Sequence, residues 1–244
     1  RRAPRAYTAR MIKVLETKMN FLPRMSRVIV AATFMAGSPG ALYAAPALSP
    51  AAASKAGASG ALAGAKAPNL AAYGSLPMYF EKNIGQTDAS VKFFARASGY
   101  TLYLTASEAV MVAKSAKSAA PVVVRMRLKG ANAKAPVQGR GLLPGHTSYM
   151  RGNDRSKWRL GARQYARVKF SSVYPGIDMV YYGKHGQVEH DFIVAPGANP
   201  GRILVGFDGV ESLRLDPQGN LILGVPGGEV TYQAPTLYQT IASR

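Results

Sequence analysis

Residues 174–194 read YPGIDMVYYGKHGQVEHDFIV, two β-rich runs on either side of a short polar turn at Lys184–Gly186. This pattern predicts a β-hairpin. Successive side chains of a strand point to opposite faces, so the second run places Val188, His190, Phe192 and Val194 on one face and Gln187, Glu189, Asp191 and Ile193 on the other. We expect the first face to enter a hydrophobic core and most of the second to stay in water.

The chain on both sides of this hairpin shows the same kind of pattern. Short β-rich runs alternate with turn residues, and none has the period of a long helix. The runs are 91–96, 100–105, 108–112, 121–128, 167–173, 203–207, 212–215, 221–225 and 229–232. Asp216–Asn220 is predicted to be a hairpin turn and Lys129–Ala166 a long loop. The chain is therefore predicted to be all-β, an antiparallel β-sandwich or distorted barrel of short strands.

The charge of the chain is strongly positive and unevenly distributed. Its 244 residues include 31 Lys or Arg and 12 Asp or Glu, a formal net charge of +19. Residues 125–169 hold twelve basic side chains against Asp154 alone, whereas residues 174–244 hold four against seven acidic ones. The chain has no Cys, which excludes disulfides, a thiolate nucleophile and a Cys-ligated zinc site.

The N-terminal region has the order of features found in a secretory signal peptide. Arg24 and Arg27 precede an apolar run at 28–36, and small, Gly and Pro residues follow it. We expect cleavage near Ala44 or Ala47, so that the protein touches a membrane only transiently through this segment. The predicted location is secreted or at the cell surface.

Three segments follow from this interpretation. Residues 1–44 are predicted to be leader and signal peptide, residues 45–72 a disordered linker, and residues 73–244 the β-rich domain. The linker is rich in Ala, Gly, Ser and Pro and has too few large apolar groups to offset the entropy of ordering it.

Distinctive motifs occur in order along residues 76–239. They are LPMYFEKNIGQ (76–86), FFAR (93–96), GYTLYL (99–104), GND (152–154), KW (157–158), YARV (165–168), VYPGID (173–178) and EHDF (189–192). They resemble the N-terminal domain of unknown function that precedes SBBP-type β-propeller repeats in bacterial secreted and surface proteins. Lys82, where that family more often has Pro, and the more basic residues 160–163 depart from its pattern. The family pattern continues into further strands and then the repeats, so we expect this domain to be truncated at its C-terminus.

The resemblance implies a non-catalytic, N-terminal structural or interaction module of an exported cell-surface protein. It implies β-propeller repeats of the same full-length protein as a partner, and it offers no catalytic residue to carry over. We also expect no cofactor. The sequence also lacks the G-x-S-x-G, phosphate-loop and H-E-x-x-H motifs. The residues that common hydrolases and nucleotide-binding enzymes use are therefore absent as motifs. We therefore expect no enzyme activity.

The alternative of a glycan hydrolase rests on Glu189 and Asp191. Their Cα atoms are expected roughly 7 Å apart on one strand face, a spacing at which two carboxylates can divide the acid and base roles of glycoside hydrolysis. The ordinary alternative is a solvated strand face or partners for nearby basic side chains.

His190 is a third weak catalytic candidate, although a core histidine bonded to the backbone is the ordinary expectation. Asp178 either orients His190 across the hairpin or caps the turn after Pro175. We expect no metal site, because His185 lies in the turn and His146 is distant in sequence.

The basic middle of the chain interleaves cations with aromatic residues, as a polyanion-binding surface does. The candidate residues are Arg151, Arg155, Lys157, Trp158, Arg159, Arg163 and Arg167. Export favours an anionic polysaccharide or another extracellular polyanion over any intracellular nucleic acid. The alternative is an ordinary basic surface with Trp158 buried as a core anchor.

Overall fold

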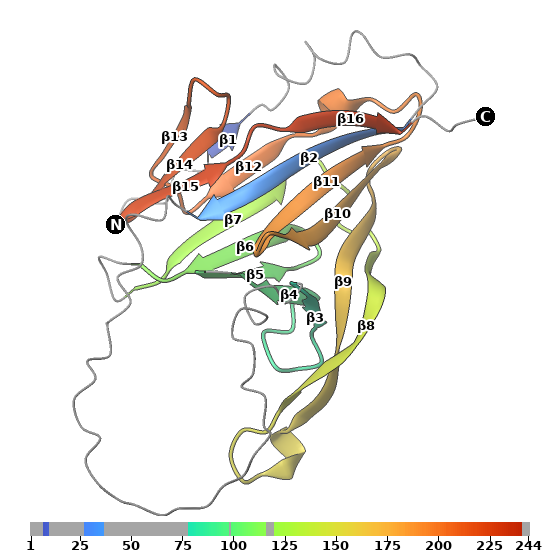
Figure 1. The fold of residues 1–244 in the computed structure, drawn as a ribbon, viewed down its shortest axis with the longest axis vertical. Coiled ribbons are helices and arrows are strands. Elements are labelled where there is room, and N and C mark those ends of the chain that lie inside the picture. The colour runs from blue at the N-terminus through green and yellow to red at the C-terminus, as the bar shows by residue number, and fades with distance from the viewer. Residues whose placement is uncertain (1–6, 10–26, 37–77, 98, 116–119, 241–244) are drawn as a thin grey trace, which may run out of the picture.

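The computed structural model describes residues 7–9, 27–36, 78–97, 99–115 and 120–240. Within these residues the regular elements are sixteen strands and two short 3-10 helices. The strands pair antiparallel into one strongly curled sheet, which continues into a smaller sheet at one end (Figure 1). The predicted all-β fold is confirmed. The predicted linker at 45–72 lies outside the described residues.

The first half of the curled sheet is a meander of strands that follow one another in the chain. These strands are β3 (Phe80–Lys82), β4 (Phe93–Arg96), β5 (Tyr100–Leu104), β6 (Glu108–Ala113) and β7 (Val122–Leu128). Beyond β7 lie β12 (Val205–Asp208) and then β1 (Tyr7–Ala9), with the 3-10 helix η2 (Pro200–Arg202) just before β12. β7 alternates as a half-buried strand does, because Val122, Val124 and Met126 are buried while Arg127 is exposed.

The second half is built around the predicted hairpin of β10 (Ile177–Lys184) and β11 (Gln187–Val194). Its two-residue turn has positive φ at both His185 (50°) and Gly186 (75°), as a type I′ turn requires. Val188, His190, Phe192 and Val194 are all buried, as predicted. β9 (Arg159–Tyr174) pairs with β10 through residues 167–174 and with β3 through Gln164 and Tyr165, and so joins the two halves.

The other side of β11 carries β2 (Arg27–Ala36), the apolar segment that sequence analysis assigns to the leader. β2 pairs on its far side with β16 (Thr236–Thr240) and with β15 (Gly228–Tyr232). The small sheet consists of β15 with β13 (Ser212–Leu215) and β14 (Leu221–Val225). Asp216 accepts hydrogen bonds from the backbone of Gln218 and Asn220, which confirms the predicted turn.

The core lies between the two halves of the curled sheet. The hydroxyl of Tyr100 on β5 accepts a hydrogen bond from the backbone N–H of Val188 on β11, 3.0 Å away. Phe207 on β12 and Tyr232 on β15 meet edge to face with ring centroids 5.5 Å apart. Contacts between strands so distant in the chain show that the sheet folds onto itself around one apolar interior.

The predicted loop at Lys129–Ala166 is wrong for most of its length. Residues 137–149 form β8 (Val137–Tyr149), which pairs with β9 in a long two-stranded hairpin that extends away from the rest of the sheet (Figure 1). The distal part of this ribbon exposes residues on both faces, so its sequence lacks the apolar-polar alternation of a half-buried strand. We call residues 140–167 the arm, bounded by the paired Arg140 and Arg167.

Candidate functional site

The arm concentrates positive charge on a projecting element. It carries seven Arg or Lys side chains and one acidic residue, Asp154. All seven residues of the predicted polyanion surface lie in its distal part or on β9: Arg151, Arg155, Lys157, Trp158, Arg159, Arg163 and Arg167. Arg151, Arg155, Lys157, Arg163 and Arg167 are exposed, whereas Arg159 is half-buried. The fold therefore brings these cations together on one element.

The tip of the arm is ordered by local hydrogen bonds around the 3-10 helix η1 (Arg155–Lys157). Asp154 caps this helix, because its carboxylate accepts from the Ser156 backbone N–H at 3.0 Å and from the Ser156 hydroxyl at 2.7 Å. The indole N–H of Trp158 donates to the backbone carbonyl of Gly152 at 3.1 Å. These bonds hold the exposed cations of the tip on a defined loop.

Trp158 is not a core anchor, and that alternative is wrong. The side chain is partly exposed at the tip, where the guanidinium of Arg155 lies 5.3 Å from its ring centroid. Its position directly after η1 keeps it away from the interior of the curled sheet. The guanidinium of Arg155 and the ring of Trp158 therefore form a cation–π contact at the surface of the tip.

Large apolar side chains also lie in water along the arm. Leu142, Met150 and Leu160 are 56%, 63% and 59% exposed. Only three other large apolar residues are similarly exposed in the part of the chain whose side chains the structure describes: Ile84, Leu215 and Tyr238. Half of these exposed large apolar groups thus belong to the arm.

A buried carboxylate attaches the arm to the body of the domain. Glu81 on β3 is 0% exposed, and its Oε1 accepts from the Tyr149 hydroxyl at 2.6 Å and from the Gln86 side-chain amide at 2.8 Å. Arg96 donates to the Tyr149 hydroxyl at 2.8 Å and lies 3.8 Å from Glu81 Oε2, which has no hydrogen-bond partner among the described residues. Burial, followed by the bond to Glu81, raises the pKa of Tyr149.

Sequence analysis missed this anchor. Glu81 stands in the quoted motif LPMYFEKNIGQ, where an acidic residue directly follows an apolar run, but nothing in the sequence links it to Tyr149, 68 positions later. The link arises because β3 pairs with β9 beside the base of the arm.

Replacing Tyr149 by Phe is expected to lower the free energy of unfolding by about 1–3 kcal/mol, because the buried carboxylate of Glu81 loses a donor. Tyr238→Phe is the matched control, since its hydroxyl donates to Asp191 at a more exposed site. Urea titration of both variants measures the difference. A loss for Tyr149→Phe no larger than for the control contradicts the role of Glu81 as an anchor.

Glu189 and Asp191 share one strand face, as predicted, and both contact the same tyrosine. The Tyr182 hydroxyl lies 3.1 Å from Glu189 Oε2 and 2.8 Å from Asp191 Oδ1, and Tyr238 donates to Asp191 Oδ2 at 2.8 Å. Lys184 lies 3.7 Å from Glu189. Burial and these carboxylates raise the pKa of Tyr182 above its usual range and that of Tyr238 to about 12. Both tyrosines therefore remain donors to the carboxylates at neutral pH.

His190 lies in the core, but its partner is a side chain and not the expected backbone group. Its Nε2 is hydrogen-bonded to the Tyr232 hydroxyl at 2.7 Å, and its ring packs against Tyr181 and Phe192. Burial lowers the pKa of His190 to about 3, so the ring is neutral in the folded protein at pH 7.

The carboxylate of Asp178 contacts β9, in the chain before Pro175. Its carboxylate accepts from the backbone N–H of Ser172 at 2.7 Å and lies 2.7 Å from the ammonium of Lys169. Ser172 has a φ of 52°, so this hydrogen bond supports a backbone conformation that is unfavourable for a non-glycine residue.

The histidines occupy three separate places: His146 on the arm, His185 in the hairpin turn and His190 in the core. Among the described residues, no three His, Asp or Glu side chains come together closely enough to hold a metal ion.

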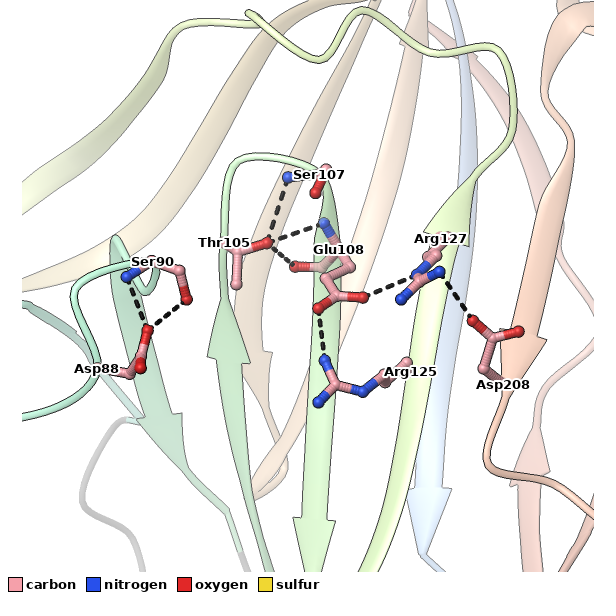
Figure 2. A network of polar contacts seen from close by, with 8 residues as sticks. All are labelled: Asp88, Ser90, Thr105, Ser107, Glu108, Arg125, Arg127 and Asp208. Atoms are coloured by element: carbon pink, nitrogen blue, oxygen red, sulfur yellow. Dashed lines mark hydrogen bonds and ion pairs between the residues drawn. The ribbon is translucent and has the colours of Figure 1, made fainter. Parts of the chain in front are cut away.

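A network of ion pairs borders a hollow at one end of the meander. Figure 2 shows Glu108 on β6 between Arg125 and Arg127 of β7, with Arg127 reaching Asp208 on β12 at 3.1 Å. Beside it lies a hollow of about 370 Å³, partly lined by Met126, Phe170 and Met179. Both cations of this network pair with carboxylates, whereas the arm has seven cations and one carboxylate, Asp154, which lies 3.3 Å from Lys157. The network therefore serves as cross-strand support.

One comparison with known proteins identifies a family for this chain. No helix within the described ranges is long and apolar enough to cross a membrane. The search of curated proteins and the search of solved structures each returned no match. A protein-family profile, described as a domain of unknown function (DUF7948), matches residues 80–244, more than half of the chain. This match spans β3 to β16, including the arm and its anchor, and the chain therefore belongs to the DUF7948 family.

Proposed function

We propose that this protein is a non-catalytic interaction module of an exported cell-surface protein, and that it binds an extracellular polyanion through the arm. The observation that carries the proposal is the projecting hairpin itself, with seven cations against one carboxylate and with exposed apolar groups along its length. Such an element combines long-range attraction for a polyanion with short-range contacts to sugar faces.

An anionic polysaccharide is the ligand class that fits best. The predicted leader would export the protein from the cytoplasm. The exported protein would then not meet intracellular nucleic acid. Arg155 and Trp158 at the tip supply a cation and an aromatic ring within 5.3 Å of each other, which suits a charged sugar.

The non-catalytic part of the proposal is supported by the surroundings of Glu189 and Asp191. Both carboxylates are hydrogen-bonded to Tyr182, and Asp191 is also bonded to Tyr238, an arrangement that fixes the strand face in place. The structural link to β-propeller repeats is supported by the motif resemblance. Repeats of about 40–50 residues encoded after Arg244 are the expected observation.

Replacing Arg151, Arg155 and Arg163 by Ala is expected to move elution of the full chain from a heparin column to clearly lower salt. These three exposed side chains are spread over the distal arm, so their loss removes much of the positive electrostatic potential of the arm. Trp158 is the only Trp, and its fluorescence should change on titration of the wild-type chain with heparin but not of the variant.

The matched control removes the same charge from the body of the domain. Lys92, Lys114 and Lys134 are exposed and lie outside the arm, and their replacement by Ala should leave elution close to that of the wild type. Equal shifts for the two triple variants would show that net charge alone governs retention, and the proposed role of the arm would then be wrong.

A further inference from the structure

Strand β2 occupies an unusual place in the sheet. Most neighbouring strands of this domain follow one another closely in the chain, but β2 ends at residue 36 and pairs with strands that begin at residues 187, 228 and 236. Figure 1 shows it between β11 on one side and β16 on the other. Its position is thus set by pairing with distant strands, without a short turn to any of them.

The space that β2 fills has two backbone edges and a mostly apolar floor. Glu189–Val194 of β11 pair with one edge of β2, and Thr236–Thr240 of β16 with Arg27–Ala31 on the other. The buried residues beside it include Phe192, Val194 and Tyr232, with His190 the polar exception. Without an occupant, β11 and β16 would each present a row of unpaired N–H and C=O groups.

The same ten residues carry the apolar run of the predicted signal peptide. A strand between two others cannot leave a sheet without opening both of them, yet export would remove this one. The two properties are compatible if the position is a groove that accepts a separate strand.

We propose that the groove between β11 and β15–β16 is a strand-binding site for an extended apolar polypeptide segment running antiparallel to β11. Arg27–Ala36 is its occupant within this chain. Binding of this kind takes its affinity from backbone pairing and its register from alternate side chains that enter the floor. The groove does not depend on the proposed function, but its opening on removal of the leader rests on the proposed export of the protein.

Cysteine pairs test the occupant and its register in the full-length chain, which has no Cys of its own. Ile29 stands directly opposite Ile193, so Ile29→Cys with Ile193→Cys is expected to form an intramolecular disulfide on mild oxidation. The control pair, Val30→Cys with Ile193→Cys, places the two thiols on opposite faces of the sheet and should stay reduced. The protein is produced without export, so that the leader stays attached.

A second experiment tests exchange. A protease site inserted between residues 45 and 72 allows the chain to be cut after folding, and the N-terminal fragment is expected to stay bound. An excess of a peptide with the sequence of residues 27–36 should displace it, whereas a shuffled peptide of the same composition should not. Gel filtration and mass spectrometry report which fragment remains.

Three results would overturn the proposal. In the cysteine test these are equal oxidation of both pairs and a disulfide that joins two copies of the chain. In the exchange test it is a cut chain that loses its N-terminal fragment and binds neither peptide. Heparin retention is measured on the same samples. Retention that persists while the cysteine test fails would refute the groove alone, and the reverse would refute only the arm as a polyanion site.

Discussion

Acidification from pH 6 to pH 4.5 is expected to lower the free energy of unfolding by about 2 kcal/mol through His190 alone. The pKa of this residue is about 3 in the folded protein because the ring is fully buried, against 6.5 for the free side chain. Below pH 6.5 His190 is therefore mostly protonated in the unfolded chain but stays neutral in the folded chain until the pH approaches 3. The stabilisation is complete above pH 6.5 and is lost as the pH falls toward 3, at about 1.4 kcal/mol per pH unit.

Denaturant titrations at half-unit pH steps measure this slope, and the range from pH 6.5 to 5 separates it from carboxylate titration. The groups that face His190 are Tyr181 and Tyr232, and burial raises the pKa of both, so they stay neutral throughout. His190→Gln keeps a polar side chain beside the Tyr232 hydroxyl and should flatten the slope in this range. The double variant His146→Gln with His185→Gln should keep the wild-type slope, and a flat profile for it would refute the assignment to His190.

Gly209→Ala is expected to destabilise the protein by about 3 kcal/mol. Gly209 follows β12 with a φ of +80°, which is unfavourable for alanine. A Cβ there would also stand 2.1 Å from the backbone carbonyl oxygen of Val123 in β7, and that oxygen cannot move without disturbing the central meander. The backbone strain and the steric overlap therefore both destabilise the alanine variant. The overlap arises because β12 pairs directly with β7.

Gly130→Ala is the matched control for this prediction. Gly130 has a similar φ of +68°, but a Cβ there meets nothing within 4 Å, so only the backbone cost of about 1 kcal/mol is expected. Thermal and urea unfolding of the two variants separate backbone strain from steric overlap. Equal losses would mean that the approach of Gly209 to Val123 carries no weight.

The sequence predicted the meander and the central hairpin because their alternation is local. In β11 a period of two residues is enough to assign Val188 and Phe192 to the interior, whatever lies on the other side of the core. The two-residue turn at His185–Gly186 is equally local, because its backbone angles depend on the residues of the turn itself.

The candidate cations of the arm were also visible in the sequence, since charge density can be counted along a chain. Their setting was not. The arm exposes both faces of a two-stranded ribbon, so it has no apolar period, and the sequence of residues 137–149 predicts a loop. The sequence also left open whether Trp158 lies on the surface or in the core, and in the structure its indole N–H bonds to Gly152 at the tip.

The amino-acid sequence by itself determined that this protein is all-β, where most of its strands lie, which faces are apolar, and where its positive charge is concentrated. These properties depend on neighbours within a few positions, so side-chain period and composition are sufficient. Only the tertiary structure decided that Glu81 holds Tyr149, that Tyr232 holds His190, and that the segment at 27–36 lies between β11 and β16. Each of these contacts joins residues 40 or more positions apart, and their meeting follows from how the sheet curls, which no local pattern in the chain records.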